Sequence, residues 1–189
     1  MAKLYDSANP SGTTWNKQTQ KLAVAPGICA GMTAVWCLKM SMGLPAAQTQ
    51  PGKDESTYLQ FVYDLHSTNA KGLIEEFLPR ARLVWENKSC WTGNGRGQIA
   101  AIGKEGNGHT YFWGYPGHAI GAARRDRDYY LFDPDYGLCE FLSVGDFCAH
   151  MEARYKKQLD DENADWTMFM VSYDPQYRTN TRYRGTEKA

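Results

Sequence analysis

Apolar residues recur at intervals of three and four in three segments of the first half of the chain. This spacing places them on one face of a helix and predicts helices near residues 28–42, 55–67 and 71–79. The positions expected to face the core are Met32, Val35, Trp36 and Met40 in the first helix, Tyr58, Phe61, Val62 and Leu65 in the second, and Leu73, Ile74, Phe77 and Leu78 in the third. Gly43-Leu44-Pro45 ends the first helix, and Pro79 ends or kinks the third.

The second half of the chain changes to short runs of β-type residues separated by turns. These runs predict an antiparallel meander with strands near 98–103, 110–115, 117–124, 128–133 and 138–142, and a last strand near 166–173. Ser143 and Asp146 form a variant of the capping box and open a helix near 144–158, with Phe147, Met151 and Tyr155 facing inward. Helices followed by a sheet in a chain of this length predict an α+β domain.

Composition divides the chain into three parts. Residues 1–25 are polar and irregular, residues 26–175 hold the predicted helices and strands, and residues 176–189 form a polar tail. The sequence has no internal repeat. We therefore expect one domain, at 26–175, between two polar ends.

Charge and hydropathy restrict the class of partner. The 21 basic and 21 acidic side chains cancel, whereas nucleic acid and anionic membranes require a basic excess. No apolar stretch approaches the length of about 20 residues that a membrane-spanning helix needs, and the N-terminus lacks the layout of a secretory signal. We expect no nucleic-acid partner and no membrane segment.

The cysteines predict a reduced chain. There are five, at positions 29, 37, 90, 139 and 148, with no CxxC pair. An odd number without paired spacing fits buried free thiols better than a disulfide framework or a zinc site. We therefore expect no metal.

Cys29 has a feature that the other cysteines lack, because it falls in the first turn of the predicted helix 28–42, just after Pro26-Gly27. A thiol reacts as the thiolate, and the unpaired N–H groups and dipole of a helix N-terminus favour a negative charge. The competing interpretation is that Cys29 is a small buried hydrophobic residue, as free cysteines usually are. Taken alone, Cys29 fits that interpretation better.

His118 and Asp133 are expected to meet across a hairpin. His118 begins one predicted strand, and Asp133 ends the next one. If a two-residue loop at 125–126 joins them, residues 118 and 133 are directly opposed and point to the same side of the sheet. An imidazole and a carboxylate at that separation can form a hydrogen bond.

Together these residues indicate a catalytic triad, with Cys29 as nucleophile, His118 as general base and Asp133 holding the imidazole in orientation. Alone, His118 would be a surface strand residue, and Asp133 would be a turn residue. The rival for the base is His109, which precedes the strand at 110–115. The remaining histidines, His66 and His150, lie on predicted helices with no strand-borne carboxylate nearby in sequence.

Three segments around these residues resemble one protein family. They are 27–32 (GICAGM) with Trp36, 117–120 (GHAI), and 130–137 (YLFDPDYG) with Phe141. In this order they resemble the YopT/AvrPphB cysteine proteases, which are peptidase family C58 of clan CA. The likeness covers roughly residues 25–173, and its most specific part is the block around His118 and Asp133.

The resemblance implies a papain-like fold, with the nucleophile helix packed on a central antiparallel sheet, and a Cys/His/Asp triad that needs no cofactor. It also implies an effector that a bacterial secretion system delivers into the target-cell cytoplasm, where it cleaves a restricted protein substrate. The resemblance is also compatible with a secretion chaperone as a further partner. Papain-type enzymes use Asn in the place of Asp133, so we expect Asp133→Asn to cause only a modest loss of activity.

The oxyanion hole is where the sequence departs from the papain pattern. Papain-like enzymes place a polar side chain a few residues before the cysteine, but positions 22–26 are all apolar. The nearest candidates are Gln18 and Gln20, with the Cys29 backbone N–H as the second donor.

Two other functions stay open. A glutamine deamidase or transglutaminase-type toxin would use the same three residues, because both reactions pass through an acyl thioester. A non-catalytic binding module would instead present an exposed aromatic face made of Trp85, Trp91, Trp113 and Tyr115.

Overall fold

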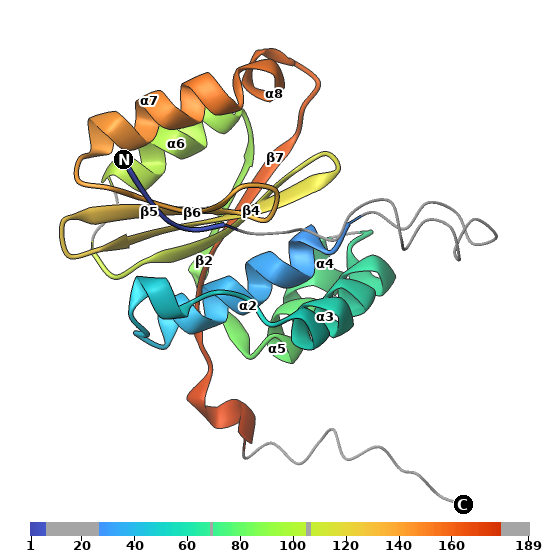
Figure 1. Ribbon diagram of the computed structural model, residues 1–189. Coiled ribbons are helices and arrows are strands. Elements are labelled where there is room, and N and C mark those ends of the chain that lie inside the picture. Colours follow the sequence, from blue (N-terminus) through green and yellow to red (C-terminus); the bar gives the residue numbers. More distant parts are fainter. Residues whose placement is uncertain (7–26, 69, 105–106, 179–189) are drawn as a thin grey trace, which may run out of the picture.

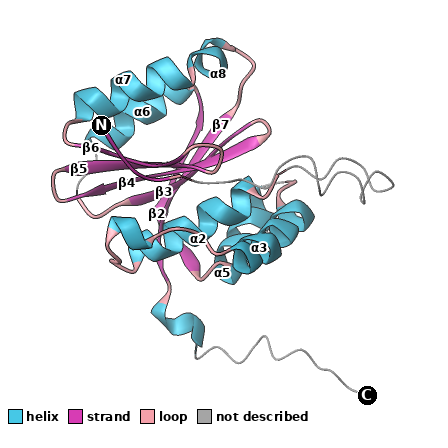
Figure 2. Cartoon of the chain, viewed as in Figure 1, coloured by secondary structure: helices cyan, strands magenta, loops and turns pink. Residues whose placement is uncertain are grey.

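The computed structural model describes residues 1–6, 27–68, 70–104 and 107–178, which form a sheet with helices on both faces (Figures 1 and 2). Within this part of the chain the sheet has seven antiparallel strands, in the order β1-β6-β5-β4-β3-β7-β2. The strands are β1 (Ala2–Tyr5), β2 (Leu83–Gly93), β3 (Thr110–Tyr115), β4 (His118–Arg125), β5 (Asp128–Asp133), β6 (Gly137–Phe141) and β7 (Trp166–Tyr173). The predicted α+β architecture is confirmed.

Helices cover the two faces of the sheet in separate groups (Figure 1). On one face lie α2 (Cys29–Ser41), α3 (Lys53–His66), α4 (Ala70–Gly72), the π-helical turn η2 (Leu73–Phe77) and α5 (Leu78–Arg80). On the other lie α6 (Gly95–Lys104), α7 (Val144–Arg154) and α8 (Lys156–Asp160). Two short 3-10 turns, η1 (Ala46–Gln48) and η3 (Pro175–Arg178), complete the described elements. None of the described helices is long and apolar enough to cross a membrane.

Most of the predicted elements are confirmed. The helix expected at 28–42 is α2, and the one expected at 71–79 is the helical run 70–80, which continues through Pro79 in its last turn. The helix expected at 144–158 is divided at Tyr155 into α7 and α8. Ser143 caps α7 as expected, because its hydroxyl accepts a hydrogen bond from the Asp146 N–H at 3.1 Å.

The strand predicted at 98–103 is wrong, since these residues belong to α6. Gln98, Ile99 and Ile102 are buried, at the three- and four-residue spacing of a helix, but so short a run does not distinguish helix from strand in the sequence. No element was predicted for β1 or β2. Both are edge strands of the sheet, each paired on one side only.

Helix α3 exists as predicted and Val62 is buried as expected, but the rest of its buried face differs from the predicted one. Tyr58, Phe61 and Leu65, expected inside, are 55, 61 and 58% exposed. The helix instead approaches α2 so closely that a Cβ atom on Gly31 would lie 1.9 Å from the Ser56 carbonyl oxygen. Small and polar residues therefore form much of its buried face, and their contribution is invisible to a pattern of apolar residues.

Helix α2 is fixed on the sheet by a large aromatic contact. Trp36 is fully buried and stacks on Phe132 of β5, with ring centroids 5.6 Å apart. Gly121 of β4 leaves the space for this indole, because a Cβ atom there would lie 2.4 Å from Trp36 Cε3. The position of α2 thus depends on a glycine in the strand that begins with His118.

We expect Gly121→Ala to lower the free energy of unfolding by about 1–3 kcal/mol, because the added methyl group must displace a closely packed indole. The control is Gly97→Ala in α6, where an added Cβ atom has nothing within 4 Å. There alanine should stabilise the helix by up to about 1 kcal/mol. Urea unfolding measures both, and unchanged stability in Gly121→Ala would contradict this account of α2 packing.

Candidate active site

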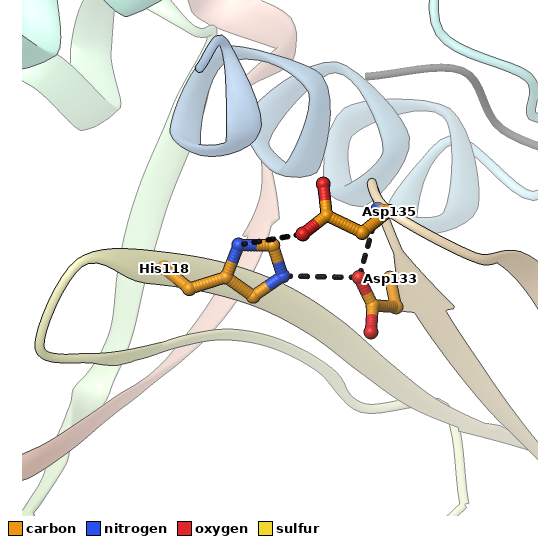
Figure 3. A group of neighbouring side chains, drawn as sticks. All are labelled: His118, Asp133 and Asp135. Carbon is orange, nitrogen blue, oxygen red and sulfur yellow. Dashed lines mark hydrogen bonds and ion pairs between the residues drawn. The ribbon is translucent and has the colours of Figure 1, made fainter. Parts of the chain in front are cut away.

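His118 and Asp133 are hydrogen-bonded side by side at the end of β4 and β5 (Figure 3). His118 Nε2 lies 3.0 Å from Asp133 Oδ1, and the two side chains are 11 and 4% exposed. The expected proximity of these residues is therefore present in the structure. Because Asp133 occupies Nε2, the nitrogen left to exchange a proton with another group is Nδ1.

The pairing that brings them together differs from the one predicted. The turn lies at residues 126–127, with Arg125 opposite Asp128 and Gly121 opposite Phe132. In this register His118 is a diagonal neighbour of Asp133, so the prediction of direct opposition is wrong. Asp126 takes the turn position with a positive φ of 57°, a conformation that aspartate tolerates better than most residues. The two registers differ by two residues, so both keep the side chains on the same face of the sheet.

Asp133 is a buried carboxylate with four donor groups around it. Oδ1 accepts hydrogen bonds from His118 and from the Asp135 N–H at 2.9 Å. Oδ2 accepts from Tyr155 Oη at 2.7 Å and from Arg154, whose Nε and Nη2 both lie 3.0 Å away. Burial raises the pKa of Asp133, but these bonds and the charge of His118 outweigh it and hold the pKa well below its ordinary value of 3.8.

The imidazole of His118 is biased toward its protonated form. Burial lowers its pKa, but the hydrogen bonds with Asp133 and Cys29, and the charges of both groups, raise it to about 10. The Cys29 thiol therefore acts directly on the protonation of His118. Asp135 contributes a weaker contact, with its Oδ2 3.8 Å from Nδ1.

These two shifts predict how stability depends on pH. The folded protein binds the His118 proton more tightly than the unfolded chain, so this contribution is complete below about pH 6.5 and is lost as the pH rises to about 10. Asp133 has a lowered pKa, so its contribution is present above its ordinary value of 3.8 and is lost as the pH falls. We expect the free energy of unfolding to be largest between about pH 3.8 and about pH 6.5. Above that range it should fall toward pH 10 by at most about 1.4 kcal/mol per pH unit.

Urea unfolding at a series of pH values from 3 to 10 measures this dependence. The matched control is His118→Asn, which removes the titrating group and should flatten the alkaline slope. A wild-type stability that does not change between pH 7 and pH 10 would contradict the prediction.

Cys29 is the first residue of α2, as predicted, and two contacts from other elements fix this helical turn. Thr33, one turn further along α2, donates a hydrogen bond to the carbonyl of Ala119, the neighbour of His118, at 3.0 Å. Gln60 of α3 accepts a hydrogen bond from the Gly31 N–H at 3.1 Å. Sequence reasoning missed both Thr33 and Gln60, because their partners lie 86 and 29 residues away.

The other cysteines for which the structure gives an environment differ from Cys29. Burial raises the pKa of Cys37, Cys139 and Cys148, and each is a free thiol. Their thiolate forms are accordingly disfavoured, as expected for structural cysteines. The environment of the Cys90 side chain lies outside what the structure describes.

The rival histidines occupy different surroundings. His109 Nδ1 lies 3.7 Å from Glu86 Oε2, and both side chains are partly exposed. His150 is held by burial and by Arg154 at a pKa below its ordinary value. His66 is the last residue of α3. In the described part of the chain, none of these surroundings includes Cys29.

The proposed oxyanion-hole side chains, Gln18 and Gln20, lie outside the described residues. The Cys29 N–H belongs to the first turn of α2, where backbone donors have no acceptor within the helix. The oxyanion hole therefore stays a prediction.

His118, Asp133 and Asp135 could in principle hold a metal ion, because one ligand atom from each lies within 4.8 Å of the others (Figure 3). The donors around Asp133 argue against this use. Both of its oxygens already accept hydrogen bonds, and one of the partners is the permanently charged Arg154. The cluster fits a hydrogen-bonded acid–base site better than a metal centre.

The aromatic residues considered for a binding face do not form one exposed surface. Trp113 is fully buried, and its Nε1–H donates to Gln98 Oε1 at 2.6 Å. Trp85 and Tyr115 are half-buried. The side chain of Trp91 is not among those that the structure describes. These positions favour a structural role for Trp113.

The fold is the papain-like α+β fold, with α2 packed on the central antiparallel sheet, and it is of the YopT/AvrPphB type. The structure of the avirulence protein AvrPphB from Pseudomonas matches with a TM-score of 0.58 at 17% identity, over 77% of this chain and 91% of that one. PatoxP, a cysteine protease-like domain of the toxin PaTox from Photorhabdus asymbiotica, matches with a TM-score of 0.50 at 11% identity. That match covers 84% of this chain and 52% of the PatoxP chain. A scan of protein-family models and a search of curated proteins find no match.

Proposed function

We propose that this protein is a cysteine endopeptidase whose triad is Cys29, His118 and Asp133. The observation that carries the proposal is the buried His118–Asp133 pair, whose imidazole also interacts with the thiol at the start of α2. A protonated imidazole beside a thiol at a helix N-terminus supports a reactive thiolate. The similarity in fold to AvrPphB and PatoxP supports the same function.

In the proposed reaction the Cys29 thiolate attacks the carbonyl carbon of the scissile peptide bond. His118 then gives its proton to the departing amine as the C–N bond breaks, which leaves an acyl thioester on Cys29. A water molecule loses a proton to His118 and attacks the thioester, and the breaking C–S bond returns the thiolate beside the imidazolium. Asp133 keeps the ring aimed through both steps.

We further propose a bacterial effector or toxin that reaches the cytoplasm of a target cell and cleaves a specific protein there, with residues 26–175 as the protease domain. The words avirulence protein and toxin in the names of the two similar structures support this setting. The delivery system, a secretion chaperone and self-processing belong to the same proposal. The balanced charge of the chain supports a protein substrate over nucleic acid.

Incubation with the soluble proteins of a candidate target cell, followed by chemical labelling of new N-termini, tests the function. We expect new N-termini with the wild-type protein and none with Cys29→Ala. If instead an intact target gains about one mass unit and no N-terminus appears, the protein is a glutamine deamidase using the same thioester chemistry. If neither change occurs and a thiol-reactive probe labels Cys29 no faster than the other cysteines, the protein is a binding module.

A further inference from the structure

Two residues at the end of α7 hold the oxygen of Asp133 that faces away from His118. Arg154 approaches Oδ2 with both Nε and Nη2 at 3.0 Å, and Tyr155 donates its O–H to the same oxygen at 2.7 Å. No motif in the sequence pointed to this contact, because the two residues follow Asp133 by 21 and 22 positions. The contact is direct and charge-assisted, and both Arg154 nitrogens approach the same carboxylate oxygen.

The fold explains why α7 supplies these groups. Along β4, Ala119 and Ala123 pack in the core with α2, whereas Ile120 and Ala122 pack in the core with α6 and α7. Side chains alternate between the two faces of a strand, so His118 points to the same face as Ile120 and Ala122. The His118–Asp133 pair therefore lies on the α7 side of the sheet. The end of α7 lies on this side of the sheet, and from it Arg154 and Tyr155 reach Asp133.

The guanidinium group of Arg154 is held in place by more than the ion pair. Its Cζ lies 4.2 Å from the centre of the Tyr136 ring, in the turn that follows Asp133. Tyr155 is 3% exposed and forms the C-cap of α7, with its N–H bonded to the Met151 carbonyl. An arginine fixed on two sides against a buried carboxylate is unlike an exposed surface ion pair, whose partners move freely.

The charge of Arg154 matters because of what His118 must do in the proposed reaction. Each cycle passes through a stage in which the imidazole is neutral, after it has given its proton to the leaving amine. If His118 were the only cation beside it, Asp133 would then be a buried, unbalanced carboxylate, which is strongly unfavourable. Such a carboxylate would hold the imidazole proton and oppose its transfer. Arg154 stays charged at all relevant pH values and removes this opposition.

We propose that Arg154 is a positioning residue that keeps Asp133 ionised and aimed at His118 while the imidazole is neutral, and that Tyr155 assists it in the same contact. This inference rests on the proposed function for its role in a reaction cycle. Its physical content, that Arg154 weakens the hold of Asp133 on the His118 proton, can be measured without any substrate.

Several other groups also bear on the protonation of His118. Those in contact with the ring or close to it are Cys29 of α2, Tyr115 of β3, Asp133 of β5 and Asp135 of the following turn. Arg154 and Tyr155 act through Asp133. A Cys29→Ala background removes the thiol, whose own titration would otherwise overlap with that of His118. Any change on mutating Arg154 then reports on the imidazole alone.

The experiment is an NMR titration of the His118 imidazole in this Cys29→Ala background. We expect Arg154→Gln to increase the proton affinity of His118 by about tenfold, since it removes a cation bonded to the carboxylate that holds the ring. Arg154→Lys keeps the charge and should stay within about threefold of the parent. Tyr155→Phe removes one donor from Oδ2 and should shift the affinity in the same direction by about twofold to threefold.

The matched control is Arg96→Gln. Arg96 ties α6 to the α7–α8 region through Glu152, Asp160 and the Leu159 carbonyl, but its hydrogen bonds do not include Asp133. We expect lower stability with an unchanged His118 titration. In the otherwise wild-type enzyme, Arg154→Gln should lower kcat about tenfold and leave KM within about twofold, because the defect lies in proton transfer.

An unchanged His118 titration in Arg154→Gln, or an equal shift in Arg96→Gln, would overturn the proposal. If Arg154→Gln does not fold, Tyr155→Phe decides, and an unchanged titration there overturns it as well. Failure of the proposed function looks different, because the wild type would then cleave nothing while the titration still responded to Arg154.

Discussion

Replacing Cys29 with alanine is expected to abolish turnover while the protein stays folded. In the proposed mechanism the sulfur forms the covalent intermediate, so kcat/KM should fall on the order of 10⁴-fold or more. The cost in stability should be small, about 1 kcal/mol, because Cys29 lies in the first turn of α2 and is less deeply buried than Cys37. Hydrolysis of one substrate and a thermal melt measure the two effects separately.

Cys37→Ala is the matched control, since it makes the same change on the same helix. Cys37 is fully buried, and its thiol donates to the Tyr111 carbonyl at 3.5 Å. We expect the opposite pattern, a clear loss of stability with activity kept. A thiol probe at pH 6 should likewise label Cys29 before Cys37. Full activity in Cys29→Ala would end the assignment of the nucleophile.

The sequence was sufficient to propose Cys29, His118 and Asp133 as a triad, because each has a local signal. Cys29 follows a Pro-Gly break at the start of an apolar helical pattern, and the parity of positions 118 and 133 places both side chains on one face of a hairpin. The sequence did not determine the exact register of the pairing between β4 and β5. The turn sequence Arg124-Arg125-Asp126-Arg127-Asp128 allows two registers, and the positive φ of Asp126 in the fold selects one.

The residues that support the proposed triad had no such signal. Thr33, Gln60 and Arg154 act through partners 86, 29 and 21 positions away, and only the three-dimensional fold brings those partners together. The same limit explains α3, where Tyr58 and Phe61 form an apolar stripe that the structure leaves exposed. A periodic pattern predicts a helix, but which side packs inward depends on the neighbour, here the close contact at Gly31.

The structure also changes the expectation for Asp133→Asn, which the likeness to papain-type enzymes had suggested would be mild. Each carboxylate oxygen of Asp133 faces donors only, His118 and the Asp135 N–H on one side, Arg154 and Tyr155 on the other. An asparagine must turn its NH₂ group toward one of these sets. Whichever way it turns, donors meet donors in a buried site, and Arg154 loses its counter-charge.

We therefore expect Asp133→Asn to lower the free energy of unfolding by about 3 kcal/mol and kcat/KM by on the order of 10³-fold or more, close to the effect of Asp133→Ala. The control is Asp135→Asn, the same change two residues on, at a half-exposed carboxylate 3.8 Å from His118 Nδ1. There the loss should stay within about 0.5 kcal/mol, because exposed ion pairs contribute little. Urea unfolding and kcat/KM on one substrate compare the three variants. If Asp133→Asn keeps the stability and activity of Asp135→Asn, the donors around Asp133 rearrange and its negative charge is dispensable.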